Sequence, residues 1–286
     1  MAEKDMNSKV LEALNDVFAD IVNVLLFNGE AVISENSLSE TSTYSNYTTN
    51  GKIREQERDI AKYWSNSEIR IAKVGFENET EDEPDMPLRV LSYDGASYRA
   101  QFSPKNNNPR FPVVTLVLYF GYKRRWNKAK TLYERVNVPE RLAPYVNDYR
   151  MNLFEIAYLS EEQVKLFKSD FRFVADYYVQ LRKTGKYVPM TEDIQHVSEL
   201  LGIMSALTND NRYVEAYDEL KGKERVNMCT VLDEVEARGK ALGEAKGEER
   251  LSSLITILLN NNDHDAIALV TSNKKARDEY YKKYNL

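Results

Sequence analysis

The chain has 286 residues, a formal net charge of −6 and 42% hydrophobic residues, which suits a globular protein long enough to bury a sizeable core. The only cysteine is Cys229, and the two histidines, His196 and His264, are far apart. These counts exclude an intramolecular disulfide and argue against a zinc cluster, so a metal site would need oxygen ligands. The polar N-terminus and the lack of a long apolar run predict a cytoplasmic protein that does not enter a membrane.

The first predicted element is a helix from Asp5 to Asn28, because apolar residues recur three and four positions apart along it. Its other side carries Asp16, Asp20 and Asn23, also at helical spacing. These residues are expected to form a solvated face. A site role for that side of the helix stays open if the edge of a catalytic sheet lies over it.

A strand meander is predicted next. Ala31 to Ile33 is expected to be a short strand, and Ser34 to Lys52 is polar enough to be a loop, which either closes over a site or only connects two elements. Two strands then follow, Glu55 to Trp64 and Ile69 to Glu79. The turn between them, Ser65 to Glu68, is short enough for antiparallel pairing.

A crossover helix and a buried strand complete the predicted sheet. Pro87 sets the start of a helix from Met86 to Gln101. Phe111 to Gly121 is almost continuously apolar, as in a strand that is buried on both faces. The resulting order, α-β-β-β-α-β, predicts an α/β fold with a small mixed sheet flanked by helices.

The second half of the chain is predicted to be mostly helical. Met151 to Leu159 is expected to be one more strand, and a capping box at Ser160 to Gln163 opens a helix that runs to about Lys183. Further helices follow from Thr191, with interruptions predicted at Gly202, Asn209 to Asn211 and Lys221 to Lys223. This pattern suggests a first domain over residues 1–159 and an α-helical region over residues 160–286.

One repeat stands out in the helical region. From Ala237 to Glu248, glycines and alanines each recur every four residues. A glycine costs about 1 kcal/mol in a helix relative to alanine, so the repeat needs a reason. It either permits close helix packing between subunits or serves as a semi-flexible helical spacer, and the sequence does not choose between these alternatives.

Three carboxylates have the spacing of a metal site. Glu77 and Glu79 alternate on one predicted strand, so they face the same way about 7 Å apart, and Asp59 can approach Glu77 from the neighbouring strand. Such ligands suit Mg²⁺ or Mn²⁺, which can activate water and stabilise the leaving oxygen of a phosphodiester. Asp59 and Glu77 are the expected metal ligands, and Glu79 the base or water-orienting group.

Other residues fit supporting roles around such a site. Arg58 and Arg89 can neutralise phosphate charge, and Gln101 can position water or the strand backbone. The alternative is a polar hairpin whose acidic side chains face solvent, since acidic residues two apart are common in a chain with this charge content.

A basic segment follows the buried strand and offers a nucleic-acid contact. Its candidate residues are Lys123, Arg124, Arg125 and Lys128, with Trp126 among them. These side chains can touch phosphates, and the aromatic ring can stack on a base. A solvated basic loop is the alternative.

Short motifs along the chain resemble those of the Rpn family of recombination-promoting nucleases, also described as transposases, of the PD-(D/E)XK nuclease superfamily. The motifs are Asn15 to Asn23, Gln56 to Asp59, Gly75 to Thr80, Met86 to Arg89, Tyr93 to Tyr98, Pro112 to Gly121 and the repeat after Glu236. The resemblance covers about residues 10 to 250. It lies in the order and spacing of the elements more than in any single motif.

The resemblance implies a restriction-endonuclease-like fold and metal-dependent cleavage of DNA, linked to recombination or mobile elements. It places Asp59 at the family's metal-binding aspartate and Glu77 at the acidic residue that opens the E-x-Q or E-x-K element. Asp16 matches an acidic residue on the first helix and gains a supporting role. Glu79 departs from the pattern because glutamate stands where the family has glutamine or lysine.

Two functions follow from these observations. The first is a Mg²⁺- or Mn²⁺-dependent DNA endonuclease whose helical C-terminal region serves homodimerisation or DNA capture. The second is a catalytically weak or inactive protein that keeps the nuclease fold as an interaction or DNA-binding module. Glu79 separates them, because a glutamate cannot supply the positive charge that a lysine would bring to the reaction.

Overall fold

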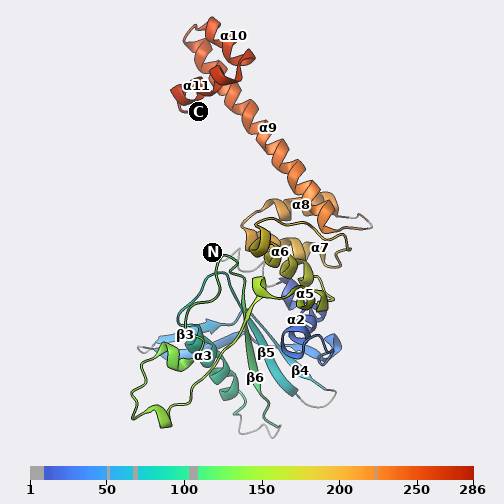
Figure 1. Cartoon of the computed structure of the whole chain (residues 1–286), viewed down its shortest axis with the longest axis vertical. Helices are drawn as coiled ribbons and strands as arrows, with labels where there is room; N and C mark the ends of the chain where they lie inside the picture. The colour runs from blue at the N-terminus through green and yellow to red at the C-terminus, as the bar shows by residue number, and fades with distance from the viewer. Residues whose placement is uncertain (1–9, 50–51, 67–69, 103–108, 222, 224) are drawn as a thin grey trace. The chain divides into compact units, whose positions relative to one another are not determined.

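The computed structural model describes residues 10–49, 52–66, 70–102, 109–221, 223 and 225–286 (Figure 1). They form two compact units, 1–229 and 230–286. The strands are β1 (Leu38–Glu40), β2 (Tyr44–Thr49), β3 (Lys52–Glu57), β4 (Ile60–Ser65), β5 (Arg70–Glu79), β6 (Val113–Tyr119) and β7 (Asn152–Glu155). The helices are α2 (Asn15–Phe27), α3 (Met86–Arg99), α4 (Leu132–Arg135), α5 (Glu161–Leu166), α6 (Phe171–Thr184), α7 (Val197–Thr208), α8 (Arg212–Leu220), α9 (Met228–Asn260), α10 (His264–Ser272) and α11 (Lys274–Tyr284). Short 3₁₀ turns span Glu35–Ser37, Ala143–Tyr145 and Ile156–Tyr158.

The first helix is interrupted within the predicted range. Residues 10–13 are helical, the backbone of Leu14 is extended with ψ 136°, and α2 then runs to Phe27. Residues 5–9 lie outside the described part of the chain. Asn28 ends the helix in the left-handed conformation, with φ 53°, as an asparagine at a helix C-terminus often does.

The strand predicted over Ala31 to Ile33 does not form. The side chain of Asn23 accepts hydrogen bonds from the backbone N–H of Val32 (3.1 Å) and Ile33 (2.8 Å) and donates one to the carbonyl of Ile33 (2.8 Å). These contacts occupy backbone groups that a strand would use for pairing. The polar segment after Ser34, predicted to be a loop, instead contains β1 and β2.

The main sheet is mixed and has the strand order β1-β4-β5-β6-β7. β1 and β5 pair with β4 antiparallel, whereas β6 pairs in parallel with both β5 and β7. The predicted antiparallel pairing of the strands around Asp59 and Glu77 is thus confirmed from Ile60 onward. The predicted strand from Glu55 to Trp64 is divided, because β3 ends at Glu57 and forms a separate hairpin with β2.

The crossover from β5 to β6 through α3 is confirmed. Helices α2 and α3 cover opposite faces of the sheet, since Phe76 stacks on Phe18 of α2 (ring centroids 4.4 Å apart) while its neighbour Glu77 contacts Arg89 of α3. β6 is buried along nearly its whole length, as its apolar sequence predicted. The contact between Glu77 and Arg89 therefore lies between β5 and α3, within the first unit.

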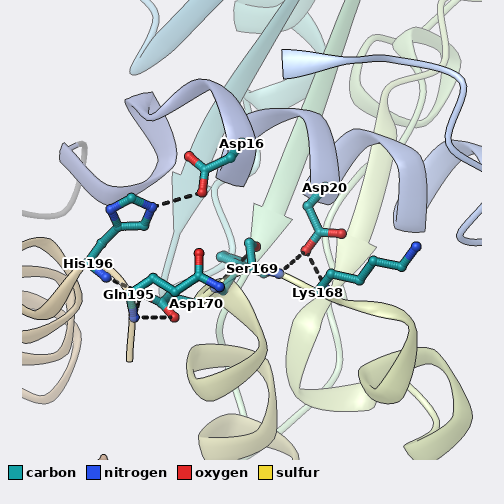
Figure 2. Close-up of polar contacts among 8 residues, drawn as sticks. Asp16, Asp20, Lys168, Ser169, Asp170, Gln195 and His196 are labelled. Atoms are coloured by element: carbon teal, nitrogen blue, oxygen red, sulfur yellow. Dashed lines mark hydrogen bonds and ion pairs between the residues drawn. The ribbon is translucent and has the colours of Figure 1, made fainter. Parts of the chain in front are cut away.

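The helix predicted from Ser160 to Lys183 forms in two parts. Its start is confirmed, since Ser160 and Gln163 make both hydrogen bonds of a capping box. It breaks after α5 because the backbone N–H groups of Lys168 and Ser169 donate to Asp20 of α2, both at 2.8 Å. The chain resumes as α6, so this contact with the first helix sets the break (Figure 2).

The later helices follow the prediction with one exception. Gly202 lies inside α7, whereas Asn209 ends that helix with φ 59° and α8 ends at Leu220. In the second unit, Leu254, Leu258, Ala266, Val270 and Tyr281 form a small apolar core among α9, α10 and α11. The glycine and alanine repeat belongs to α9, where residues 241–250 are exposed. Within the described residues, no helix is long and apolar enough to cross a membrane.

Candidate active site between β5 and α3

Glu77 is the centre of the polar cluster beneath α3. The residue is 1% exposed and lies on β5 between two neighbouring strands. Its Oε2 accepts a hydrogen bond from Nη2 of Arg89 at 3.1 Å, while its Oε1 is buried without a hydrogen-bond partner among the described residues. An unsatisfied buried carboxylate oxygen costs free energy unless a donor or a cation reaches it.

Glu79 shares the same arginine. Nη1 of Arg89 lies 3.0 Å from Oε1 of Glu79, so one guanidinium bridges the two glutamates. This confirms that Glu77 and Glu79 face the same way. Arg89 also donates to the hydroxyl of Tyr93 at 3.3 Å, and its side chain is 41% exposed. It is therefore both an internal ion-pair partner and a charge accessible to solvent.

Asp59 lies at the break between β3 and β4, not within a strand. Ile60 pairs with Phe76, so one further step along the antiparallel register places Asp59 opposite Glu77. Oδ2 of Asp59 accepts a hydrogen bond from the backbone N–H of Asn78 at 2.8 Å. This bond holds Asp59 just before the start of β4, beside Glu77, the residue with which it was expected to act.

Burial and neighbouring charges raise the pKa values of both glutamates. Burial, and next the negative charge of Asp59, raise the pKa of Glu77 to about 8, against the opposing effect of Arg89. Burial raises the pKa of Glu79 to about 7, again opposed by Arg89. Near neutral pH the cluster therefore retains protons that carboxylates usually release, and a cation would compete with those protons.

A fourth carboxylate, Glu12, approaches from the other face of the sheet. Glu12 is fully buried, and its Oε2 accepts a hydrogen bond from Nδ2 of Asn78 at 2.6 Å. Burial, with a further contribution from Asp59, raises its pKa to about 8. The sequence reasoning missed Glu12, because the break at Leu14 shifts the helical phase and turns an ordinary polar position inward.

Arg58 and Asp94 form a second buried group beside the cluster. Nη2 of Arg58 lies 2.9 Å from Oδ1 of Asp94, which also accepts a hydrogen bond from the hydroxyl of Thr115 at 2.6 Å, and Oδ2 accepts one from Tyr149. Arg58 is 2% exposed. It is thus an internal partner of Asp94, which the sequence did not single out, and does not lie at a surface where it could meet a phosphate.

Gln101 holds backbone in place, one of its two expected roles. Its side-chain amide donates to the carbonyl of Phe111 (3.1 Å) and accepts from the N–H of the same residue (3.0 Å). These two bonds attach the end of α3 to the segment that leads into β6.

The basic segment after β6 is partly neutralised. Arg124 pairs with Asp82 at 2.6 Å and Arg125 with Glu155 at 2.7 Å, although both arginines remain more than 60% exposed. Lys123 and Lys128 are exposed. Trp126 cannot stack on a base as predicted, because it is 4% exposed and packs edge-on against Tyr119 with ring centroids 5.3 Å apart.

Asp16 belongs to a different group of contacts, shown in Figure 2. Its Oδ2 lies 2.8 Å from Nε2 of His196, the residue before α7. Asp170 in turn accepts hydrogen bonds from the backbone N–H groups of Gln195 (3.0 Å) and His196. Asp16 therefore joins α2 to the start of α7 and does not contact the carboxylates of β5.

Comparisons with known proteins give no assignment. No protein-family model matches the chain, and neither the curated proteins nor the solved structures contain a match.

Proposed function

We propose that this protein is a metal-dependent DNA endonuclease of the PD-(D/E)XK superfamily, related to the Rpn nucleases and acting in recombination or on mobile elements. The observation that carries the proposal is the buried Oε1 of Glu77, which has no hydrogen-bond partner among the described residues and belongs to a carboxyl group close to Asp59. A divalent cation would satisfy that oxygen and offset the repulsion between the two acidic groups.

The residues fit Mg²⁺ or Mn²⁺ with two protein ligands. Among the described residues, no group of three or more His, Cys, Asp or Glu side chains is arranged to hold a metal. Mg²⁺ usually keeps several waters and takes only one or two carboxylates from the protein, so Asp59 and Glu77 suffice as ligands. When bound, such an ion supplies an activated water and stabilises charge on the phosphate oxygens.

Arg89 provides the positive charge that residue 79 lacks. The guanidinium touches Glu79 at 3.0 Å and is partly exposed, so it can turn toward a phosphate that enters the site. Glu79 then holds Arg89 beside the reacting group, and the pair takes the place of a lysine. The exposed Lys123, Arg124, Arg125 and Lys128 are proposed to bind the DNA backbone.

The alternative is a non-catalytic interaction or DNA-binding module, and one observation favours it. Arg89 already satisfies one oxygen of each of the two glutamates, so the cluster can be read as a structural ion-pair network without metal. Homodimerisation through the helical C-terminal region is a prediction under either function.

A nicking assay distinguishes the two functions. Purified protein is incubated with supercoiled plasmid and Mg²⁺ or Mn²⁺, alongside Asp59→Ala and Glu77→Gln. We expect metal-dependent nicking that falls at least about 100-fold in both variants, because removal of a metal ligand removes activation of the water. Asp193→Asn is the matched control, since that carboxylate is paired with Arg225 at the surface.

Metal binding is measured separately by the electron paramagnetic resonance signal of Mn²⁺. Wild type is expected to bind Mn²⁺ more tightly than Asp59→Ala. If wild type nicks no faster than both variants with either metal, the protein is not this nuclease and the alternative stands.

A further inference from the structure

A hollow opens directly beyond the candidate active site. It has a volume of about 320 Å³, and its lining includes Thr80, Asp82, Gly121, Tyr122, Lys123 and Arg124. We call it the β5–β6 hollow because these residues follow the carboxyl ends of the parallel strands β5 and β6, where open α/β sheets commonly bind ligands. Thr80 directly follows Glu79, so the hollow begins where the carboxylate cluster ends.

Tyr122 provides an aromatic wall. The ring is partly buried and packs at an angle of 52° against the buried ring of Tyr178, which also lines the hollow, with centroids 6.2 Å apart. The ammonium group of Lys123 lies 5.9 Å from the centroid of Tyr122. An aromatic ring with a neighbouring cation is suited to stacking on a nucleobase next to its phosphate.

Asp82 adds a hydrogen-bond acceptor to the hollow, because only one of its two carboxylate oxygens is bonded to a residue that the structure describes. Its side chain is 1% exposed, and Oδ1 binds Nη2 of Arg124 at 2.6 Å. The other oxygen, Oδ2, is buried without a hydrogen-bond partner in the described part of the chain. A bound group that offers an N–H would satisfy Oδ2. Lys123 and Arg124 offer positive charge to a phosphate, while Glu81, an exposed carboxylate, also lines the hollow. The hollow thus combines a ring, an acceptor for N–H and two cations.

We propose that the β5–β6 hollow binds one unpaired nucleotide of a DNA strand, with the base on Tyr122, an N–H of its edge toward Asp82 and its phosphate near Lys123 and Arg124. The proposal rests on the proposed nuclease function and deepens it, because it names single-stranded or locally unpaired DNA as the substrate class. A base inside a duplex cannot offer both its face and its edge in this way.

The test measures binding without cleavage. The probe is a short single-stranded oligonucleotide with one central 2-aminopurine, added to full-length protein in EDTA, and its fluorescence falls when the base stacks. We expect Tyr122→Ala to weaken binding about 5- to 150-fold, the range for loss of one base–aromatic stack, and Tyr122→Phe to retain it. Tyr145→Ala is the control, because Tyr145 is 84% exposed and does not line the hollow.

The same probe in a perfect duplex is expected to bind more weakly than the single strand. Equal binding by Tyr122→Ala and Tyr145→Ala, or a preference for the duplex, would overturn the proposal. Each variant's unfolding curve is compared with wild type, and Tyr122→Phe, which keeps the ring, shows whether a loss in Tyr122→Ala reflects stacking.

Asp82 is tested with two oligo(dT) probes, one unmodified and one with N3-methylthymine in place of thymine. Wild type is expected to prefer the unmodified probe, because N3-methylation removes the edge N–H of thymine, and Asp82→Asn is expected to reduce that preference. No preference in wild type overturns the role of Asp82. These measurements need no metal, so the two proposals can fail separately. If the protein binds the oligonucleotide through Tyr122 but does not nick DNA, the nuclease function is refuted and nucleotide binding by the hollow is retained. If the protein nicks DNA but Tyr122→Ala binds the oligonucleotide as well as wild type does, nucleotide binding by the hollow is refuted and the nuclease function is retained.

Discussion

Arg58 and Asp94 face each other between the sheet and α3, with Nη2 of the arginine 2.9 Å from Oδ1 of the aspartate and both residues less than 5% exposed. The pair joins the break before β4 to the middle of α3, and Asp59 is the next residue after Arg58. A buried ion pair of this kind contributes little net stability, but removal of one partner strands the other charge. It therefore makes the position of Asp59 depend on a residue of the crossover helix.

Asp94→Ala is expected to lower the free energy of unfolding by about 3–5 kcal/mol, because Arg58 would keep a buried charge without its counter-ion. The measurement is urea unfolding followed by tryptophan fluorescence. Both tryptophans, Trp64 and Trp126, belong to the unit that contains the sheet, so the signal reports on that unit. Arg225→Ala is the matched control, since its pair with Asp193 is largely exposed and solvent screening leaves such a pair little effect on stability.

Gly75→Ala is expected to destabilise the same unit by about 1–3 kcal/mol, the usual cost of overpacking. An added Cβ would lie 2.3 Å from Cδ of Arg58 and 2.8 Å from the carbonyl oxygen of Ile60, so the Arg58 side chain and the backbone at the start of β4 would have to move. Gly95→Ala, in α3, would place the new atom more than 4 Å from the described residues beyond its own stretch of helix, and should instead stabilise by up to about 1 kcal/mol. Equal effects of the two substitutions would show that Gly75 does not make room for Arg58.

Glu12 predicts a pH dependence of stability. Its pKa is raised by burial from 4.5 to about 8, so the folded protein holds a proton that the unfolded chain releases in that window. Stability therefore falls as the pH rises from about 5 to 8, by up to about 1.4 kcal/mol per pH unit for one such group. Glu12→Gln cannot lose a proton and should show a shallower decline, with higher stability than wild type at pH 8.

Unfolding curves at pH 5.5 and pH 8 test this expectation. Glu77 and Glu79 shift in the same direction, so the comparison is between the slopes of wild type and Glu12→Gln rather than between absolute values. Identical slopes would mean that Glu12 is ionised in the folded protein.

Asp20→Ala should destabilise the protein by about 1–3 kcal/mol, because the N–H groups of Lys168 and Ser169 would lose their shared acceptor. Asp20→Asn keeps a side-chain carbonyl at the same place and should recover most of that loss. Hydrogen exchange at Lys168 and Ser169 provides a local readout, and protection that is unchanged in Asp20→Ala would contradict the assignment.

The sequence predicts elements well where local signals agree. Three predicted elements lie within a few residues of their observed positions: the buried strand β6, the start of α3 at Pro87, and the start of α5 at the capping box of Ser160. The missed boundaries depend on distant partners. In the break before β4, Asp59 accepts a hydrogen bond from the backbone N–H of Asn78, and the break after α5 involves Asp20, about 150 positions away in sequence. Contacts between residues that are distant in sequence produce no periodic pattern from which they could be predicted.

The candidate site divides in the same way. The alternation of side chains along a strand is enough to predict that Glu77 and Glu79 lie on one face. In the structure, both contact Arg89 on that face. Glu12 and Asp94 were missed because their burial arises from helix phase and tertiary packing, which a single sequence does not reveal. The sequence left a site role open for Asp16 and the resemblance gave it a supporting role, whereas in the structure its partner is His196.

The alternation of side chains between the two faces of β5 also restricts where insertions and deletions can occur. Phe76 and Asn78 face α2 and Glu12, whereas Glu77 and Glu79 face Arg89. A one-codon insertion or deletion between Gly75 and Glu79 would exchange these two sets, bringing the acidic side chains against Phe18, and β4 and β6 on either side leave no slack to absorb it. Length variation should therefore be excluded from this strand.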